Sequence, residues 1–293
     1  MERVAVVGVG AIGGVVAARL LEKGRCDVTL CVRTPFEKLV VETPKRVIES
    51  RVRCATDPSA VTRADWVLLA TKAHQTGGAA GWLKALAGPG TVIAVLHNGV
   101  EHVERVTPFA NGAHVLPVVV QCPADKVGLG RVKHRSFVRL VAPDGPHGRG
   151  LAALFEGTDV EVPLTQDIRT DLWTKLTVNC AQSPITGLTR RRREVLGRED
   201  VSEVSLAMAR ECASVGRAAG AKLPPGFAEE VIARQKKMPP DATTSMLTDA
   251  WEGKPLEMDA FTGAVIRFGE KHGIPTPVTR VVHALGSAIN RED

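Results

Sequence analysis

The feature that most constrains this chain lies at its N-terminus, where an apolar run passes directly into glycines at fixed spacing. Residues 3–9 (RVAVVGV) have the composition of a buried parallel strand. Helical spacing then follows as far as Gly24 and is carried by Ile12, Val15, Val16, Leu20 and Leu21. A strand, a glycine turn and a helix in this order open a βαβ unit, so the sequence predicts a parallel sheet that starts with the first residues.

The glycines of this turn match GxGxxG, and each meets a separate steric demand of a bound dinucleotide. Gly8 permits the tight turn, Gly10 lets the backbone approach a pyrophosphate, and Gly13 allows the helix to pack closely on the sheet. The helix N-terminus then offers unpaired N–H groups and a partial positive charge to the phosphates. We therefore predict a dinucleotide cofactor bound on Gly8, Val9, Gly10, Ala11, Ile12 and Gly13.

The end of the second predicted strand distinguishes between the two nicotinamide cofactors. About 20 residues beyond the glycines, an acidic side chain would accept hydrogen bonds from a ribose 2′-OH, whereas an arginine would neutralise a 2′-phosphate. This chain has VTLCVRT there, with Arg33 at the strand tip and no acidic residue before Glu37. The alternative is an ordinary solvent-facing loop arginine; we favour NADPH.

The rest of the chain divides into a region of predicted strands and a region of predicted helices. Further apolar strands are predicted at residues 28–32, 66–70, 91–96 and 114–120, residues 130–143 alternate apolar with polar side chains, and residues 159–162 form a last short strand. Helical period prevails afterwards, over residues 167–182, 201–219, 226–237, 256–272 and 277–289. The predicted fold is α/β, with an N-terminal Rossmann-type doubly wound parallel sheet over residues 1–165 that binds NADP, followed by an all-helical C-terminal domain over residues 166–293 that completes the active site.

Polar residues follow two of the later strands. Lys72 and Gln75 stand in TKAHQT, and Asn98 stands in HNGV. Ligands of open α/β sheets lie beyond the carboxyl ends of the strands, so these side chains are expected to line the cofactor cleft. An ordinary surface lysine is the alternative for Lys72.

Composition excludes several classes of protein. The net charge of +6, and a single basic run at residues 190–193 without interleaved aromatic residues, fall short of a nucleic-acid-binding signature. No basic leader opens the chain, and no apolar stretch reaches the ~18 residues of a membrane span. The six cysteines are scattered without metal-ligand spacing, so we expect free thiols in a reducing cytoplasm and no bound metal.

Reduction of a carbonyl by NADPH also needs a proton donor, and the chain contains no tyrosine. Lysine and histidine are then the main candidates. The segment LWTKLTVNCAQSP places Lys175, Asn179 and Ser183 four residues apart, so a continuous helix would present all three on one face, beside an apolar stripe of Leu172, Leu176 and Cys180. The wet face of an amphipathic helix is the alternative.

A second group of polar residues lies near the C-terminus. Ser245, Glu257 and Asp259 occur around a predicted helix start at which Pro255 is well placed. Acidic residues there stabilise the helix dipole, which is the alternative to a functional role for Glu257.

At this point the motifs GVGAIGG, TKAHQT, HNGV, LWTKLTVNCAQSPITGL and TSMLTDAWEGKPLEMD, in this order, resemble the ketopantoate reductases over nearly the whole chain. The resemblance implies NADPH-dependent reduction of 2-dehydropantoate (ketopantoate) to pantoate, on the route to pantothenate. It implies that residues 8–13 hold the phosphates, Arg33 the 2′-phosphate, and Lys72 and Asn98 further parts of the cofactor.

The resemblance also implies the roles of the polar residues on the helical side. Lys175 matches the proton donor, Asn98 and Asn179 match substrate contacts, Ser245 matches another, and Glu257 matches an acid that contacts the cofactor and supports the active site. A cationic Lys175 would bind the keto acid, polarise its carbonyl and donate the proton.

Three positions depart from the family pattern, because Ser183, Arg193 and Ala242 stand where asparagines are expected. Ser183 is kept as a substrate-binding candidate. Lost amide groups weaken discrimination between substrates, so another branched, aryl or more acidic 2-keto acid remains an alternative, and Arg193 could pair with an extra carboxylate.

Two further interpretations stay open. One is a β-hydroxyacid dehydrogenase, disfavoured because residues 165–174 (TQDIRTDLWT) lack the glycines usual before its lysine. The other is a non-catalytic NADP(H)-sensing regulator. The sequence leaves the oligomeric state open, with a homodimer among the candidates, and fixes neither product stereochemistry nor physiological direction.

Overall fold

A computed structural model describes residues 1–290 of the chain, which divide into two compact units. The first unit comprises Met1–His97 and Glu101–Ile168, and the second comprises Asn98–Val100 together with the chain from Arg169 onward. In the described residues, no helix combines the length and the apolar character that crossing a membrane requires.

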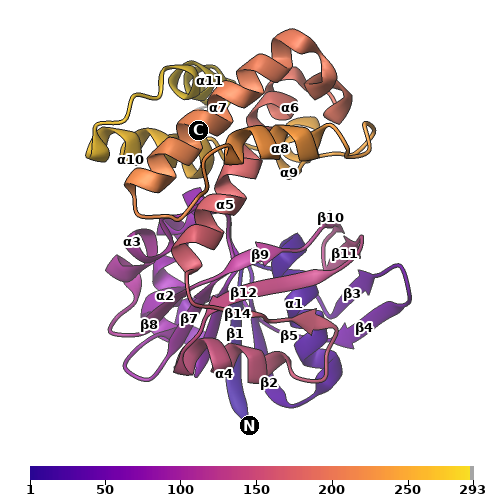
Figure 1. The fold of residues 1–293 in the computed structure, drawn as a ribbon. Coiled ribbons are helices and arrows are strands. Elements are labelled where there is room, and N and C mark those ends of the chain that lie inside the picture. Colours follow the sequence, from indigo (N-terminus) through magenta and orange to yellow (C-terminus); the bar gives the residue numbers. More distant parts are fainter. Residues whose placement is uncertain (291–293) are drawn as a thin grey trace. The chain divides into compact units, whose positions relative to one another are not determined.

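The first unit is built on a six-stranded sheet whose neighbouring strands are all parallel (Figure 1). In spatial order the strands are β5 (Arg53–Ala55), β2 (Cys26–Cys31), β1 (Glu2–Val7), β6 (Trp66–Leu69), β7 (Val92–Val95) and β8 (His114–Pro117). Helix α1 (Ala11–Lys23) connects β1 to β2. The predicted parallel Rossmann-type sheet is confirmed.

A second sheet was predicted only in part, through the alternating pattern over residues 130–143, which includes its strand at 131–134. After β2 the chain forms an antiparallel hairpin of β3 (Lys38–Glu42) and β4 (Val47–Arg51) in place of a helix. Strand β3 pairs with β11 (Arg131–His134), which pairs with β10 (Ala124–Gly128), and this sheet packs on α1. Inward-facing Leu39 and Val41 alternate with more exposed neighbours, the period of a strand with one buried face.

The predicted length of the strand over residues 114–120 is wrong. Strand β8 ends at Pro117, and β9 (Val119–Gln121) belongs to another sheet, where it pairs antiparallel with β12 (Val138–Pro143). Proline has no N–H to donate to a strand ladder, which accounts for a break at this residue. The remaining strands of this sheet, β13 (Val160–Glu161) and β14 (Leu164–Thr165), pair parallel with β12, beside which lies α4 (Pro146–Phe155).

Alternate side chains of the central strand β1 enter two separate hydrophobic cores. Val4 and Val6 pack with α1 and the second sheet, whereas Ala5 and Val7 pack with helix α2 (Ala80–Leu86) on the opposite face. Burial on both faces explains why β1 is an unbroken apolar run. This rigid double-sided packing fixes the carboxyl end of β1, where the glycine turn begins.

A buried cation stabilises the first unit. The Arg19 side chain on α1 is fully buried and pairs with Asp159 at 2.7 Å. Its Nη2 also lies 3.3 Å from Nδ1 of His134, and because a guanidinium can only donate, that nitrogen accepts. The proton of the neutral ring therefore sits on Nε2, which donates to the Phe137 carbonyl oxygen at 3.1 Å.

We expect Asp159→Ala to lower the free energy of unfolding by about 1 to 3 kcal/mol, because it leaves the buried guanidinium without its counter-ion. Burial alone would raise the pKa of Asp159, but the hydrogen bond and charge of Arg19 hold it below its ordinary value. This stabilisation is complete above the pKa of an unfolded aspartate and is lost as the pH falls through the native pKa.

Urea unfolding of the variant across acidic and neutral pH checks this expectation. Asp27→Ala is the matched control, since the Arg53–Asp27 pair is exposed on both sides and should contribute less than about 1 kcal/mol. Equal losses in the two variants would show that the Arg19–Asp159 pair is no different from a surface pair.

The described part of the second unit contains helices and no strand. Its elements are α5 (Ile168–Cys180), α6 (Ser183–Thr189), the 3-10 turn η5 (Arg193–Gly197), α7 (Glu199–Ala218), α8 (Phe227–Gln235), α9 (Ser245–Trp251), the π-helical turn η6 (Asp259–Gly263), α10 (Ala264–His272) and α11 (Pro277–Ile289). The predicted helical character of this region is confirmed.

Two predicted helices are interrupted. The helix expected over residues 167–182 ends at Cys180, because Pro184 has no N–H to donate the next helical hydrogen bond, and Gln182 leaves helical geometry with φ −133°. The helix expected from residue 256 starts as the π-helical turn η6 and becomes α-helical only at Ala264. Both interruptions fall beside predicted site residues.

Candidate active site

The glycine turn after β1 is shaped by close contacts that exclude larger side chains. Gly8 has φ +91°, and a Cβ there would lie 2.7 Å from the backbone nitrogen of Thr71. A Cβ on Gly13 would lie 2.1 Å from the carbonyl oxygen of Gly8. These glycines are therefore required by the packing of strand, turn and helix, as the sequence suggested.

Gly10 is different, because a Cβ at this position would meet nothing within 4 Å. It is the N-cap of α1, which has no side-chain cap and no acidic residue in its first turn. Nearby in the fold, the buried Thr71 hydroxyl has no hydrogen-bond partner among the described residues. Open space, uncapped N–H groups and an unsatisfied hydroxyl fit the pyrophosphate of a dinucleotide.

The other predicted cofactor residues of the first unit follow the carboxyl ends of β2 and β6. Arg33 comes two residues after β2, is exposed, and has no carboxylate within ion-pair distance in the described part of the chain. Lys72 precedes the 3-10 turn that ends at the exposed Gln75. Arg33 is therefore an exposed cation without a carboxylate partner among the described residues, which suits an anionic ligand.

In the second unit the structure joins three predicted residues in one hydrogen-bonded chain. The Lys175 ammonium donates to Oδ1 of Asn98 at 3.0 Å, and Nδ2 of Asn98 donates to Oε2 of Glu257 at 3.3 Å. Asn98 thus separates the cation from the carboxylate, which is 4% exposed. Opposite contacts at its two ends fix the amide orientation.

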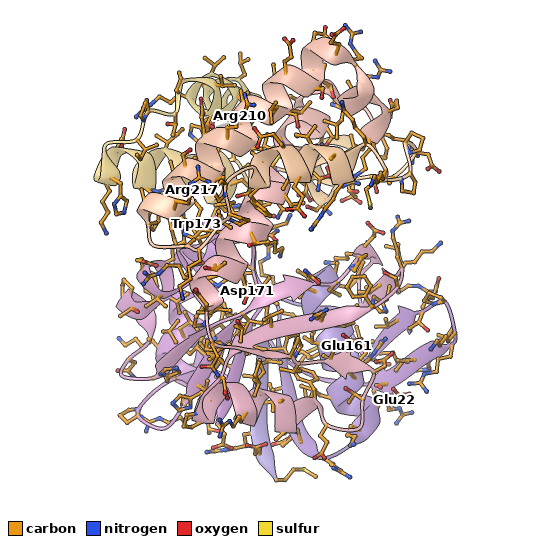
Figure 2. The ribbon with its side chains drawn as sticks, viewed as in Figure 1. Glu22, Glu161, Asp171, Trp173, Arg210 and Arg217 are labelled. Carbon is orange, nitrogen blue, oxygen red and sulfur yellow. The ribbon has the colours of Figure 1, made fainter. Side chains whose placement is uncertain are left out.

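Helix α5 presents Lys175 through the burial of its other faces. Leu172, Leu176 and Cys180 are buried, as predicted, and Trp173, labelled in Figure 2, is 2% exposed. The Trp173 ring meets Phe268 edge-on at 5.3 Å between centroids, which holds α5 against α10. Lys175 and Asn179, one turn apart, remain partly exposed on the same side of the helix.

Asn98 belongs to the second unit although it follows β7, and its neighbour Gly99 comes close to η6 in that unit. Gly99 has φ +108°, and a Cβ there would lie 3.2 Å from the carbonyl oxygen of Ala260 in η6. A side chain would strain the backbone and crowd η6. Only glycine therefore holds Asn98 against Lys175 and Glu257 in this arrangement.

We expect Gly99→Ala to reduce kcat/KM by roughly 10-fold by displacing Asn98. Gly90→Ala is the matched control, because Gly90 also has positive φ (+89°) but a Cβ there meets nothing within 4 Å. Both variants should lose about 1 to 2 kcal/mol of stability from backbone strain. Steady-state kinetics and thermal unfolding separate the effects, and equal activity losses in both variants would contradict the positioning role of Gly99.

The remaining substrate candidates are placed less simply. Ser183 does not continue the face of α5 as predicted; it begins α6 and is 3% exposed. Ser245 is exposed and begins α9, behind the N-cap Thr244, whose hydroxyl accepts from Leu247 N at 3.1 Å. Among the described residues, the side chains of Asn179, Ser183 and Ser245 make no hydrogen bond, so their polar groups remain available to a ligand.

Several structural neighbours of these residues carried no sequence signal. Thr186 and Thr244 bring their hydroxyls to 2.7 Å and join α6 to the start of α9. Gln182, in the turn between α5 and α6, accepts a hydrogen bond from Arg193. Thr244 is the exception, because a threonine directly before a helix could have indicated an N-cap. Asp259 pairs with Arg267 at 2.6 Å, so it supports its own helical segment.

Comparisons with known proteins cover nearly the whole chain. Residues 4–146 match the family described as "Ketopantoate reductase PanE/ApbA", and residues 167–290 match "Ketopantoate reductase PanE/ApbA C terminal". A 2-dehydropantoate 2-reductase of Caulobacter vibrioides is 40% identical over 98% of this chain and 99% of its own length.

Solved structures agree. A PanE/ApbA family ketopantoate reductase from Ralstonia eutropha superposes with a TM-score of 0.89 at 33% identity, covering 98% of both chains. A dimeric ketopantoate reductase from Staphylococcus aureus has the same fold, with a TM-score of 0.88 at 24% identity and 98% of both chains covered. This chain belongs to the ketopantoate reductase family.

Proposed function

We propose that this enzyme reduces ketopantoate to pantoate with NADPH. The observation that carries the proposal is the hydrogen-bonded chain from Lys175 through Asn98 to Glu257, an ammonium oriented by an amide that a buried carboxylate anchors. Membership of a reductase family supports the pyridine nucleotide, and the 40% identical relative named 2-dehydropantoate 2-reductase supports the substrate.

A nicotinamide cofactor held on the glycine turn at Gly8, Gly10 and Gly13 would supply the hydride for C2 of the keto acid. Lys175 polarises the carbonyl as a cation and gives one proton to its oxygen, so that the alkoxide becomes the hydroxyl of pantoate. The neutral amine then regains a proton from solvent. Asn98 Oδ1 accepts from the ammonium and thereby orients it, while Glu257 holds the Asn98 amide.

We assign cofactor binding to residues 1–165 and the substrate-side chemistry to residues 166–293. Gly8, Gly10 and Gly13 would hold the pyrophosphate with the N-terminus of α1, and the uncompensated Arg33 would bind the 2′-phosphate. Lys72, Gln75, Asn98 and Glu257 remain proposed further contacts to the cofactor.

Asn179, Ser183 and Ser245 are proposed to bind the substrate, because their polar side chains are available in the described part of the helical unit. A homodimer is proposed by analogy with the dimeric relative from Staphylococcus aureus. The scattered cysteines keep the reducing cytoplasm as the expected setting.

The proposal is tested by following NADPH absorbance with purified protein, ketopantoate and a panel of other 2-keto acids. We expect kcat/KM for ketopantoate to exceed that for 2-oxobutanoate and phenylpyruvate, and NADPH to be used in preference to NADH. Oxidation of NADPH with none of the keto acids would remove the reductase assignment and favour a nucleotide-sensing role.

A further inference from the structure

Arg193 is the first residue of η5 and is held by two separate contacts. Its backbone N–H donates to the carbonyl oxygen of Ala242 at 3.2 Å. Its guanidinium donates through Nη2 to Oε1 of Gln182, a side chain that is 8% exposed. Backbone and side chain together hold this guanidinium beside Gln182.

The guanidinium of Arg193 is nevertheless left partly unsatisfied. Among the residues that the structure describes, nothing accepts a hydrogen bond from its buried Nη1, and no carboxylate lies within ion-pair distance. Burial lowers the pKa of Arg193, because the charge loses water without gaining a counter-ion.

Its neighbours in the same basic run behave differently. Arg191 pairs with Glu194 at 3.2 Å, and Arg192 donates to the Asp241 carbonyl oxygen at 2.7 Å. Buried donors are normally satisfied, so an unsatisfied Nη1 on a fixed, partly desolvated cation indicates an oxygen ligand that completes it.

The contacts of Arg193 place it among the proposed substrate residues. Gln182 lies between Asn179 and Ser183 in the chain, and its backbone N–H donates to the Asn179 carbonyl oxygen at 3.2 Å. Ala242 precedes Ser245 by less than one helical turn. Lys175 lies on α5 five residues before its end at Cys180, roughly 7.5 Å along the helix, and Gln182 follows two residues later. Two long side chains and a small keto acid together can bridge a span of this order.

We propose that Arg193 determines specificity by binding the oxygen at the end of the substrate remote from the keto acid group. This inference rests on the proposed function. In ketopantoate that oxygen is the 4-hydroxyl, a neutral acceptor; a carboxylate at the same end would form a charge-assisted hydrogen bond and bind more strongly. The enzyme is therefore also a reductase of branched 2-keto diacids.

Three substrates that differ at this end test the proposal. Trimethylpyruvate has a methyl group there, ketopantoate a hydroxymethyl group, and 3,3-dimethyl-2-oxoglutarate a carboxymethyl group. With NADPH we expect kcat/KM to rise in that order, each step by roughly 10-fold. In Arg193→Ala the values for the two oxygen-bearing substrates should fall toward that for trimethylpyruvate.

Two further variants serve as controls. Arg193→Gln keeps an amide donor but loses the charge. It should retain much of the preference for ketopantoate over trimethylpyruvate, and lose most of the preference for the diacid over ketopantoate. Arg191→Ala removes a neighbouring arginine with its own carboxylate partner and should leave all three values unchanged.

The outcomes separate the inference from the proposed function. If the wild-type enzyme reduces ketopantoate but Arg193→Ala leaves the ratios among the three substrates unchanged, Arg193 is a structural residue and the inference is wrong. If no substrate is reduced at all, the proposed function itself has failed. A wild-type enzyme that rejects the diacid also overturns the inference.

Discussion

Lys175→Ala should lower kcat for ketopantoate reduction by about 10²- to 10⁴-fold while the protein remains folded. The variant removes the proposed general acid together with the positive charge beside the developing alkoxide. The side chain lies on a partly exposed face of α5, so its truncation opens no cavity in the core. Steady-state NADPH oxidation and thermal unfolding measure the two effects.

Lys175→Arg separates charge from proton donation. A guanidinium keeps the positive charge but holds its proton far more tightly than an ammonium, so KM should stay near the wild-type value while kcat remains strongly reduced. A Lys175→Arg enzyme with wild-type kcat would mean that only electrostatic stabilisation is needed. Undiminished turnover in Lys175→Ala would remove the catalytic assignment altogether.

The second large effect is expected from Arg33→Ala, which should raise KM for NADPH roughly 10- to 100-fold and leave KM for NADH nearly unchanged. A hydrogen bond to a charged group contributes about 1.5 to 3 kcal/mol, and NADH has no phosphate with which to form it. Initial rates with each cofactor at saturating ketopantoate provide the measurement.

Arg25→Ala is the matched control for this change. Arg25 is also exposed but immediately precedes the amino end of β2, whereas Arg33 follows its carboxyl end. Its loss should leave the NADPH to NADH ratio as in the wild type. Equal effects of Arg33→Ala on both cofactors would refute the 2′-phosphate contact.

The parallel sheet was predictable because local sequence determines most of it. Strands buried on both faces form unbroken apolar runs, and the glycine turn after β1 has a spacing that packing requires. The β3–β4 hairpin was missed because two short strands with one wet face resemble polar connections. The break after β8 depends on the pairing of β9 with β12. This is a contact between distant parts of the chain, which local sequence patterns do not reveal.

The site was predictable to a similar degree. The shared face of Lys175 and Asn179 follows from helical periodicity, which stays reliable up to Cys180. Ser183 was predicted on the face of Lys175 and Asn179, but Pro184, the second residue of α6, interrupts the helix, so the helical periodicity of α5 does not extend to Ser183. The contacts of Asn98 with Lys175 and Glu257 join distant parts of the chain and depend on the backbone of Gly99, so periodicity alone could not reveal them.

Restoring an ammonium at position 175 should restore proton donation to the substrate carbonyl. Lys175→Cys treated with 2-bromoethylamine regains a lysine-like side chain, and stopped-flow absorbance measures its single-turnover reduction of ketopantoate by NADPH. Identically treated wild-type enzyme and Lys175→Ala control for reaction at the native cysteines. We expect treatment to restore much of the wild-type rate only where the new thiol is present. If mass spectrometry shows complete conversion at position 175, treated wild-type enzyme stays active, and the rate still remains that of Lys175→Ala, proton donation by this ammonium is contradicted.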